Sequence, residues 1–291
     1  MALVKIEGKA VEKLIEEVSK GIGTLYRPRA IRKEAEAKAF KKEILANAEA
    51  KKILIEGEAN LELVQRTKER LVTQEFKRQL NIEEIVEKSI KYLNSDVSDD
   101  PVDDDWRTRF FNKSQDISGE DMQEIWAKIL AGEVSKPGTV SFRTLEVISN
   151  LSPKEAIKFQ VACSIASHDG LIWKINNENA LDDFDLSYSD LMMLRDAGLI
   201  HDNDTLVQIA KVLTSHGTIS YIGKDMYQVK NIKNTNLKEY RFNQIAFTTA
   251  GKELYKLLDL ELNSNYIIKL IKDRKNEGYE LIRIMIQKES N

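Results

Sequence analysis

The sequence has little cysteine and histidine and no long apolar run, and each of these absences excludes a class of protein or site. Cys163 is the single cysteine among 291 residues, so the chain can form neither an internal disulfide nor a cysteine-built zinc site. Three histidines leave little for a histidine cluster. No apolar run approaches the roughly 20 residues that span a bilayer, and the first residues lack the apolar stretch of a secretory signal. These absences predict a cytoplasmic protein in a reducing compartment.

Sequence motifs typical of catalytic, phosphate-binding and calcium-binding sites are also missing. His168-Asp169 and His201-Asp202 are sequence neighbours whose side chains diverge in regular structure, and no nucleophile motif lies near them. The glycines form no phosphate-binding turn. The aspartates of residues 94–105 lack the central Gly and terminal Glu of a calcium-binding loop. We therefore expect no catalytic, cofactor-binding or metal-binding residues; a metal-dependent hydrolase that uses these aspartates is the second alternative.

Charge divides the chain into parts of opposite sign. The net charge is only −3, yet residues 94–204 are rich in acids and residues 205–275 in bases, which is typical of a modular protein. The predicted fold class is mainly α with a small antiparallel β component (α+β). The predicted parts are a helical arm (1–93), an acidic linker (94–105), a helical module (106–152) and a winged-helix-like α+β domain (153–291).

The arm is dominated by residues that favour helices. Residues 9–20 place their apolar side chains on one face, which predicts an amphipathic helix. A long helix is expected from Arg29 to about Leu80, because this stretch has no proline and a single glycine, Gly57. Asn81 followed by acids resembles an N-cap, so a separate helix is expected over 82–93.

A helix of that length needs a partner for its apolar side chains. We expect self-association through a coiled coil or helical sheath, although Arg78 interrupts the seven-residue register. One alternative is packing along the chain's own C-terminal domain. Another is a membrane surface, contacted by residues 9–20 with the basic residues that follow, Arg27, Arg29, Arg32 and Lys33. The residues predicted for the oligomer surface are Phe40, Ile44, Val64 and Leu71.

Beyond residue 105, local signals predict alternating helices and strands. Ser118-Gly119 opens a helix that Gly132 is expected to stop, and Ser141 caps another that reaches Leu151. Further helix starts are predicted at Ser152, Ser187 and Thr248, and a helix near 266–271. Strands are predicted at 170–175, 207–209, 226–229, 240–247 and 279–286.

The order of these C-terminal elements looks like a winged-helix domain. Five basic residues would fall on or beside its wing, where cations can meet phosphate. Against DNA contact, Asp182, Asp183 and Asp185 precede the helix that would enter a groove, and their charge repels phosphate. We therefore prefer protein contact over DNA contact for this domain. The predicted anion or nucleic-acid surface comprises Lys224, Lys230, Lys233, Lys238 and Arg241.

Three motifs carry a family resemblance. They resemble those of a bacterial family classified only as a conserved domain of unknown function, and they are Asp105-Trp106-x-x-Arg109-Phe110-Phe111, Gln123-x-x-Trp126-x-x-Ile129-Leu130-Ala131-Gly132-Glu133 and Pro137-Gly138-Thr139-x-Ser141-x-Arg143-Thr144-Leu145. The segment Gly21-Ile22-Gly23-Thr24-Leu25-Tyr26-Arg27-Pro28-Arg29 looks like a lead-in module shared with that family. The resemblance implies a bacterial, non-secreted protein and brings no catalytic residues.

Most of these three motifs is explained by packing, since their apolar members are expected to form one stripe in the core: Trp106, Phe110, Trp126, Ile129 and Leu130. The polar members are less well explained by packing. Arg109 or Arg143 is expected to pair with Glu133 and fix a helix hairpin, in preference to a ligand site. The predicted polar cluster comprises Arg109, Gln123, Glu133 and Arg143.

Taken together, the sequence favours a non-enzymatic bacterial assembly or sensor protein whose main partner is a second copy, with another protein as a further partner. Lead-in modules reused before different domains occur in anti-phage defence, which is one setting for such a protein. A winged-helix DNA-binding regulator is the alternative.

Overall fold

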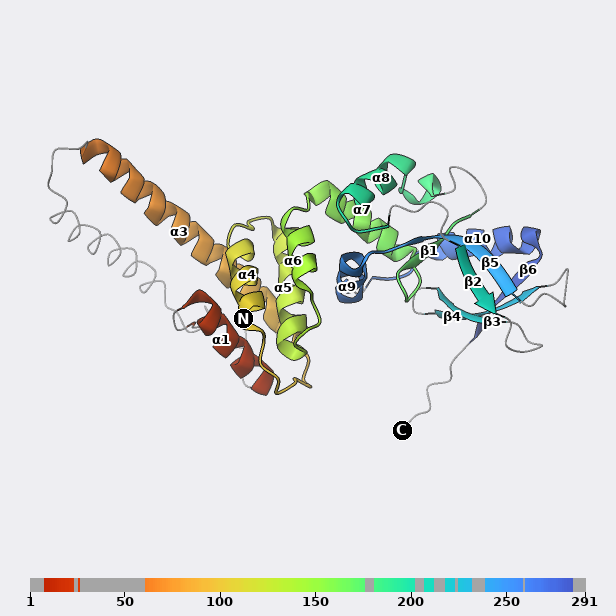
Figure 1. Ribbon diagram of the computed structural model, residues 1–291, viewed down its shortest axis with the longest axis horizontal. Coiled ribbons are helices and arrows are strands. Elements are labelled where there is room, and N and C mark those ends of the chain that lie inside the picture. Colours follow the sequence, from red (N-terminus) through yellow and green to blue (C-terminus); the bar gives the residue numbers. More distant parts are fainter. Residues whose placement is uncertain are drawn as a thin grey trace, which may run out of the picture. The chain divides into compact units, whose positions relative to one another are not determined.

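The computed structural model describes residues 8–23, 26, 61–175, 181–201, 207–211, 218–222, 225–231, 239–258 and 260–284. The chain divides into two compact units, residues 1–145 (unit 1) and 146–291 (unit 2). Unit 1 is helical, and unit 2 combines helices with small antiparallel sheets (Figure 1). The predicted α+β class is thereby confirmed.

Unit 1 is built from helices that pack around α5. Helix α1 (Lys9–Ile22) contacts α4 (Asp104–Ser114) and α5 (Glu120–Ser135). Helix α3 (Leu61–Ser89) continues into a short 3-10 turn, Ile90–Tyr92, and packs on α4 and α5 through its C-terminal half. Helix α6 (Phe142–Ser149) crosses the boundary between the units.

The predicted apolar stripe forms the centre of unit 1. Trp106 stacks on Phe110 with 5.1 Å between ring centroids, and Phe110 meets Trp126 edge-on at 5.2 Å. The indole nitrogen of Trp106 donates a hydrogen bond of 2.7 Å to the carbonyl of Val140, which ties α4 to the turn before α6. Ile129 and Leu130 are also buried, so the expected core stripe is confirmed.

Two predicted helix boundaries in unit 1 are wrong, and packing explains both. Asn81 does not cap a new helix but lies inside α3, where its side-chain amide donates to the Gln115 carbonyl at 2.8 Å. The helix continues because Ile82 and Val86 are buried beyond it. Gly132 does not stop α5, which runs on to Ser135 because Val134 beyond the glycine is buried in the core.

The acidic segment 94–103 has no regular secondary structure and belongs to unit 1. Val97 and Val102 are buried, and the backbone N–H of Ser98 donates to the carbonyl of Ser135 at 2.9 Å. Asp103 caps α4 by accepting from the Trp106 N–H at 2.8 Å, so helix begins at Asp104. At least one aspartate of this segment, Asp103, therefore has a structural role as a helix cap.

Unit 2 contains four α-helices among its described residues: α7 (Pro153–Ser164), α8 (Tyr188–Asp196), α9 (Thr249–Leu257) and α10 (Ser264–Glu277). A 3-10 turn, η3 (Asp182–Phe184), precedes α8. Ser152 and Ser187 form reciprocal capping boxes with Glu155 and Asp190, and Thr248 caps α9. These local signals were readable in the sequence, and the predicted starts are confirmed.

The strands of unit 2 form two antiparallel three-stranded sheets. One has the order β1-β5-β2 and the other the order β3-β4-β6. Strand β3 was not predicted, although Ile219 and Tyr221 alternate with polar residues in the manner of a half-buried strand. The strands are β1 (Leu171–Trp173), β2 (Val207–Lys211), β3 (Thr218–Ile222), β4 (Asp225–Asn231), β5 (Glu239–Ala246) and β6 (Tyr279–Ile284).

An aromatic cluster joins α10 to the first sheet. Trp173 stacks on Phe242 at 4.9 Å, and the Tyr266 hydroxyl donates to the Trp173 carbonyl at 2.7 Å. Burial raises the pKa of the Tyr266 phenol above its ordinary value. The buried Arg274 guanidinium lies 5.1 Å from the centre of the Phe242 ring and donates to the Lys174 carbonyl. Helix α10 is therefore fixed by both apolar and polar contacts.

The glycine at the start of α9 is required by a close backbone approach. A Cβ on Gly251 would lie 2.1 Å from the carbonyl oxygen of Leu199, whose position is fixed because it accepts from Thr248. This contact explains why the helix start Phe-Thr-x-x-Gly contains glycine.

We expect Gly251→Ala to destabilise unit 2 by about 2 kcal/mol, because backbone must move to admit the methyl group. Urea unfolding followed by hydrogen exchange of the β1 and α9 amides measures the loss. Lys256→Ala, an exposed change in the same helix, is the control and should stay within about 0.5 kcal/mol of wild type. Equal stability of the two variants would contradict the close approach.

Candidate interaction surface

The predicted polar cluster is distributed over several local contacts. The side-chain amide of Gln123 donates to the Ile117 carbonyl, and its oxygen accepts from Lys88, both at 3.1 Å. The buried Glu133 carboxylate accepts the backbone N–H groups of Gly138 at 2.7 Å and Val140 at 3.0 Å. Glu133 therefore holds the turn that connects α5 to α6.

The two arginines of the cluster are exposed. Arg109 places its guanidinium 4.6 Å from the centre of the Phe142 ring, a cation–π contact between α4 and the start of α6. Arg143 lies in the first turn of α6. Pairing of either arginine with Glu133 stays a prediction.

The predicted anion surface falls mostly where no placement is described. Lys230 lies in β4, in register with Glu280 of β6, and Arg241 lies in β5, in register with Ile209 of β2. Lys224, Lys233 and Lys238 are outside the described residues. A single basic surface formed by all five therefore stays a prediction.

The predicted oligomer surface is represented by two residues of α3. Val64 and Leu71 are 47% and 50% exposed, and the neighbouring Leu63 and Phe76 are also exposed. With about 3.6 residues per turn, Val64 and Leu71 lie on the same side of the helix as the buried Ile82. Phe40 and Ile44, the other two predicted members, lie outside the described residues.

One face of α3 is thus buried at its C-terminal end and exposed at its N-terminal end. The change occurs at Arg78, whose guanidinium pairs with Asp116 at 2.8 Å and Glu75 at 2.9 Å. We call the exposed part, comprising Val64, Lys68, Leu71 and Glu75, the α3 stripe. Among the described residues of unit 1, it is an exposed surface that carries two apolar side chains and two of opposite charge.

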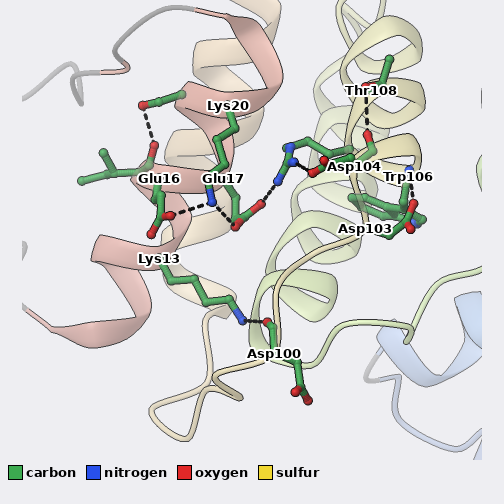
Figure 2. Close-up of polar contacts among 12 residues, drawn as sticks. Lys13, Glu16, Glu17, Lys20, Asp100, Asp103, Asp104, Trp106 and Thr108 are labelled. Carbon is green, nitrogen blue, oxygen red and sulfur yellow. Dashed lines mark hydrogen bonds and ion pairs between the residues drawn. The ribbon is translucent and has the colours of Figure 1, made fainter.

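A second polar arrangement, which the sequence did not reveal, joins α1 to α4 (Figure 2). The carboxylate of Glu17 pairs with the guanidinium of Arg107, and both side chains are buried. Arg107 also pairs with Asp104, while Lys20 pairs with Glu16 at 2.6 Å and with Glu17 at 3.4 Å. The hydrogen bond and charge of Lys20 lower the pKa of the Glu16 carboxyl.

Further contacts fix α1 along its length. The Lys13 ammonium donates to the backbone carbonyls of Ser98 at 2.7 Å and Asp100 at 2.8 Å, and Lys9 pairs with Asp99. A hydrogen bond from Lys9 lowers the pKa of the Asp99 carboxyl. At the other end, a Cβ on Gly21 would lie 2.2 Å from the Phe111 ring. The glycine of the lead-in motif is therefore explained by close helix packing.

The sequence contains one signal for this arrangement. Glu17 lies between Leu14 and Val18 on the apolar face of α1, where an unpaired carboxylate would be costly. That position implies a buried cation elsewhere in the chain. Which cation fills the role cannot be read from spacing, because Arg107 is 90 positions away.

Within the parts of the chain that are described, no group of three or more His, Cys, Asp or Glu side chains could hold a metal ion. Cys163 is buried, and desolvation raises the pKa of its thiol well above the ordinary value. None of the described helices is long and apolar enough to cross a membrane.

Removal of one partner from the Glu17–Arg107 pair should destabilise unit 1. We expect Arg107→Met to cost about 3 kcal/mol, because the Glu17 carboxylate would stay buried without its cation. The double variant Glu17→Leu with Arg107→Met should cost less than the sum of the single changes. Hydrogen exchange of α1 and α4 amides in increasing urea measures these losses.

The exposed Glu12 of the same helix supplies the control, since Glu12→Gln should leave unfolding unchanged within about 0.5 kcal/mol. Strict additivity of the two single changes would mean that Glu17 and Arg107 do not interact.

Comparison with known proteins gives a family. No curated protein and no solved structure matches the chain. Residues 65–271, more than half of the chain, match the family described as Protein of unknown function (DUF2806). The match covers α4, α5 and most of unit 2, and it begins after α1. The chain is therefore a member of the DUF2806 family.

Proposed function

We propose that this protein is a non-enzymatic assembly protein that self-associates through the α3 stripe. The observation that carries the proposal is the exposure of Val64 and Leu71 on the same helical face that is buried farther along α3. Burial of each such side chain contributes about 1.5–3 kcal/mol when the surrounding surface is completed. A second copy supplies a matching surface.

The order of charges along the stripe favours an antiparallel second copy. Lys68 and Glu75 lie on the same side of α3 as Leu71, at nearly equal distances before and after it. In an antiparallel pair centred on Leu71, Lys68 of each copy faces Glu75 of the other. Both contacts repeat by symmetry, as in a two-fold interface. Opposite charges at the rim select this arrangement over a parallel one.

The mass of the full chain in solution tests this proposal. We expect light scattering at tens of micromolar protein to give twice the single-chain mass of 33.3 kDa. Val64→Glu with Leu71→Glu should return the single-chain mass, because it places carboxylates inside the contact.

Ile268→Glu is the matched control, because Ile268 is 66% exposed on α10 and is not part of the α3 stripe. It should leave the mass doubled. A wild-type protein that stays at the single-chain mass would overturn the proposal.

A second candidate function rests on the topology of unit 2. The order α7, β1, α8, β2 and β5, with the sheet arranged β1-β5-β2, is that expected of a winged-helix-like domain. The paired strands β3 and β4 lie between β2 and β5 in sequence, at the position of the wing. This arrangement supports a regulator that binds DNA or another protein.

The surface of α8 favours protein contact. Tyr188 is 64% exposed and Met192 is 37% exposed, one helical turn apart, and both residue types are common in protein interfaces. Asp182 and Asp183, which are exposed in η3 just before α8, would repel phosphate. DNA contact would therefore depend on the predicted basic residues of the wing.

DNA binding through the wing makes a definite prediction. Fluorescence anisotropy with a labelled duplex should show affinity that falls steeply with salt, and Lys230→Glu, Lys233→Glu and Arg241→Glu together should reduce it at least tenfold. A triple reversal at Lys252, Lys256 and Lys272 controls for net charge. An equal loss in both variants, or the absence of binding, would eliminate the DNA-binding alternative.

A further inference from the structure

The side of α3 that lies opposite the α3 stripe carries a row of cationic side chains. Its four members, which we call the basic row, are Arg66, Arg70, Thr73 and Lys77. At about 100° per residue they fall within roughly 60° of one another around the helix axis, and they span roughly 16 Å along it. All four are exposed, and together they line one depression in the helix surface.

Two cations of the basic row have no acidic neighbour on their own helix. Cations on a helix surface are commonly paired with acids three or four positions away, as Arg78 is with Glu75. None of the residues three or four positions from Arg70 or Lys77 is acidic. Within the described part of the chain, neither side chain forms an ion pair. Their positive charge can therefore meet an anion from outside the helix.

The chemistry of the depression favours phosphate over a protein surface. Arginine, lysine, threonine and glutamine are side chains that donate hydrogen bonds to the phosphate oxygens of nucleic acids. Protein interfaces instead have an apolar core, and none of the described side chains in this lining is apolar. The exception to the phosphate-binding types is Glu69, whose carboxylate accepts a hydrogen bond of 2.8 Å from Gln65. The full lining is Arg66, Glu69, Arg70, Thr73, Gln74 and Lys77.

The place of the basic row in unit 1 suits a long, rod-like ligand. The row lies on the part of α3 that extends beyond α4 and α5 (Figure 1). Each strand of a DNA duplex presents a phosphate about every 3.4 Å along its axis, so a row of roughly 16 Å meets several of them. The major groove of such a duplex is wide enough to admit an α-helix.

We propose that the basic row binds the phosphate backbone of double-stranded DNA, without regard to base sequence. The Arg70 guanidinium, the Lys77 ammonium and the Thr73 hydroxyl donate hydrogen bonds to phosphate oxygens. Contacts of this kind position a protein on a duplex and carry no sequence information. The proposal does not depend on self-association, because the basic row and the α3 stripe lie on opposite sides of the helix and can be occupied together.

Fluorescence anisotropy of the full chain with two labelled duplexes of unrelated sequence tests this proposal. We expect equal affinity for the two duplexes, falling steeply as salt is raised. Arg70→Glu with Lys77→Glu should weaken the binding of both duplexes by at least about tenfold. The slope of log affinity against log salt should become shallower by about two, because two phosphate contacts are lost.

Lys136→Glu with Arg143→Glu is the matched control. It reverses one lysine and one arginine at exposed positions of unit 1 outside α3, so the net charge changes equally. Affinity should stay within about twofold of wild type. Glu69→Gln should tighten binding instead, because it removes the carboxylate from the depression. Light scattering should give the wild-type mass for the α3 double variant, since the basic row lies opposite the α3 stripe.

Four results would overturn the proposal. Neither duplex binds, or both double variants lose affinity equally, which would reflect net charge alone. The α3 double variant binds as tightly as wild type, which would assign the binding to another surface such as the wing of unit 2. Polyglutamate displaces wild-type protein as effectively as unlabelled duplex, which would assign the basic row to an acidic protein.

Discussion

Helix α3 is longer than the surface that the described residues of unit 1 provide to bury it, and this constraint shapes the rest of the unit. The helix has 29 residues, about 44 Å at 1.5 Å per residue, but burial begins near Asn81. Its C-terminal half packs with α4 and α5 around Trp126 and Phe110. Its N-terminal half keeps Val64 and Leu71 in solvent. The proposed self-association follows from this unequal burial.

The features that the sequence predicted are local ones. Each capping box spans only four residues, from Ser152 to Glu155 and from Ser187 to Asp190. Adjacent residues in the sequence are therefore enough to predict it. Asn81 resembled a cap equally well, yet its amide bonds to Gln115 across the unit while the helix continues. Local propensity fails there because the burial of Ile82 and Val86 outweighs a capping bond.

The candidate surfaces also differ in whether local sequence could predict them. Leu71 was predicted to lie on an exposed surface because a long helix cannot bury all its apolar side chains by itself, and it is exposed. The ion pair between Glu17 and Arg107 could not be predicted, because the two residues are 90 positions apart. Both are buried, and no periodic pattern in a sequence indicates which charged residues will meet in the core. The pairing of Glu133 with Arg109 or Arg143 stays a prediction, and its contacts with the backbone N–H groups of Gly138 and Val140 were not predicted.

The three tryptophans are divided between the units, and this makes the chain its own optical probe. Trp106 and Trp126 lie in the core of unit 1, whereas Trp173 is the sole tryptophan of unit 2 and stacks on Phe242. Replacing the first two with phenylalanine would confine tryptophan emission to unit 2, and replacing the third would confine it to unit 1. The two halves of the molecule can then be watched unfolding one at a time, without any attached label.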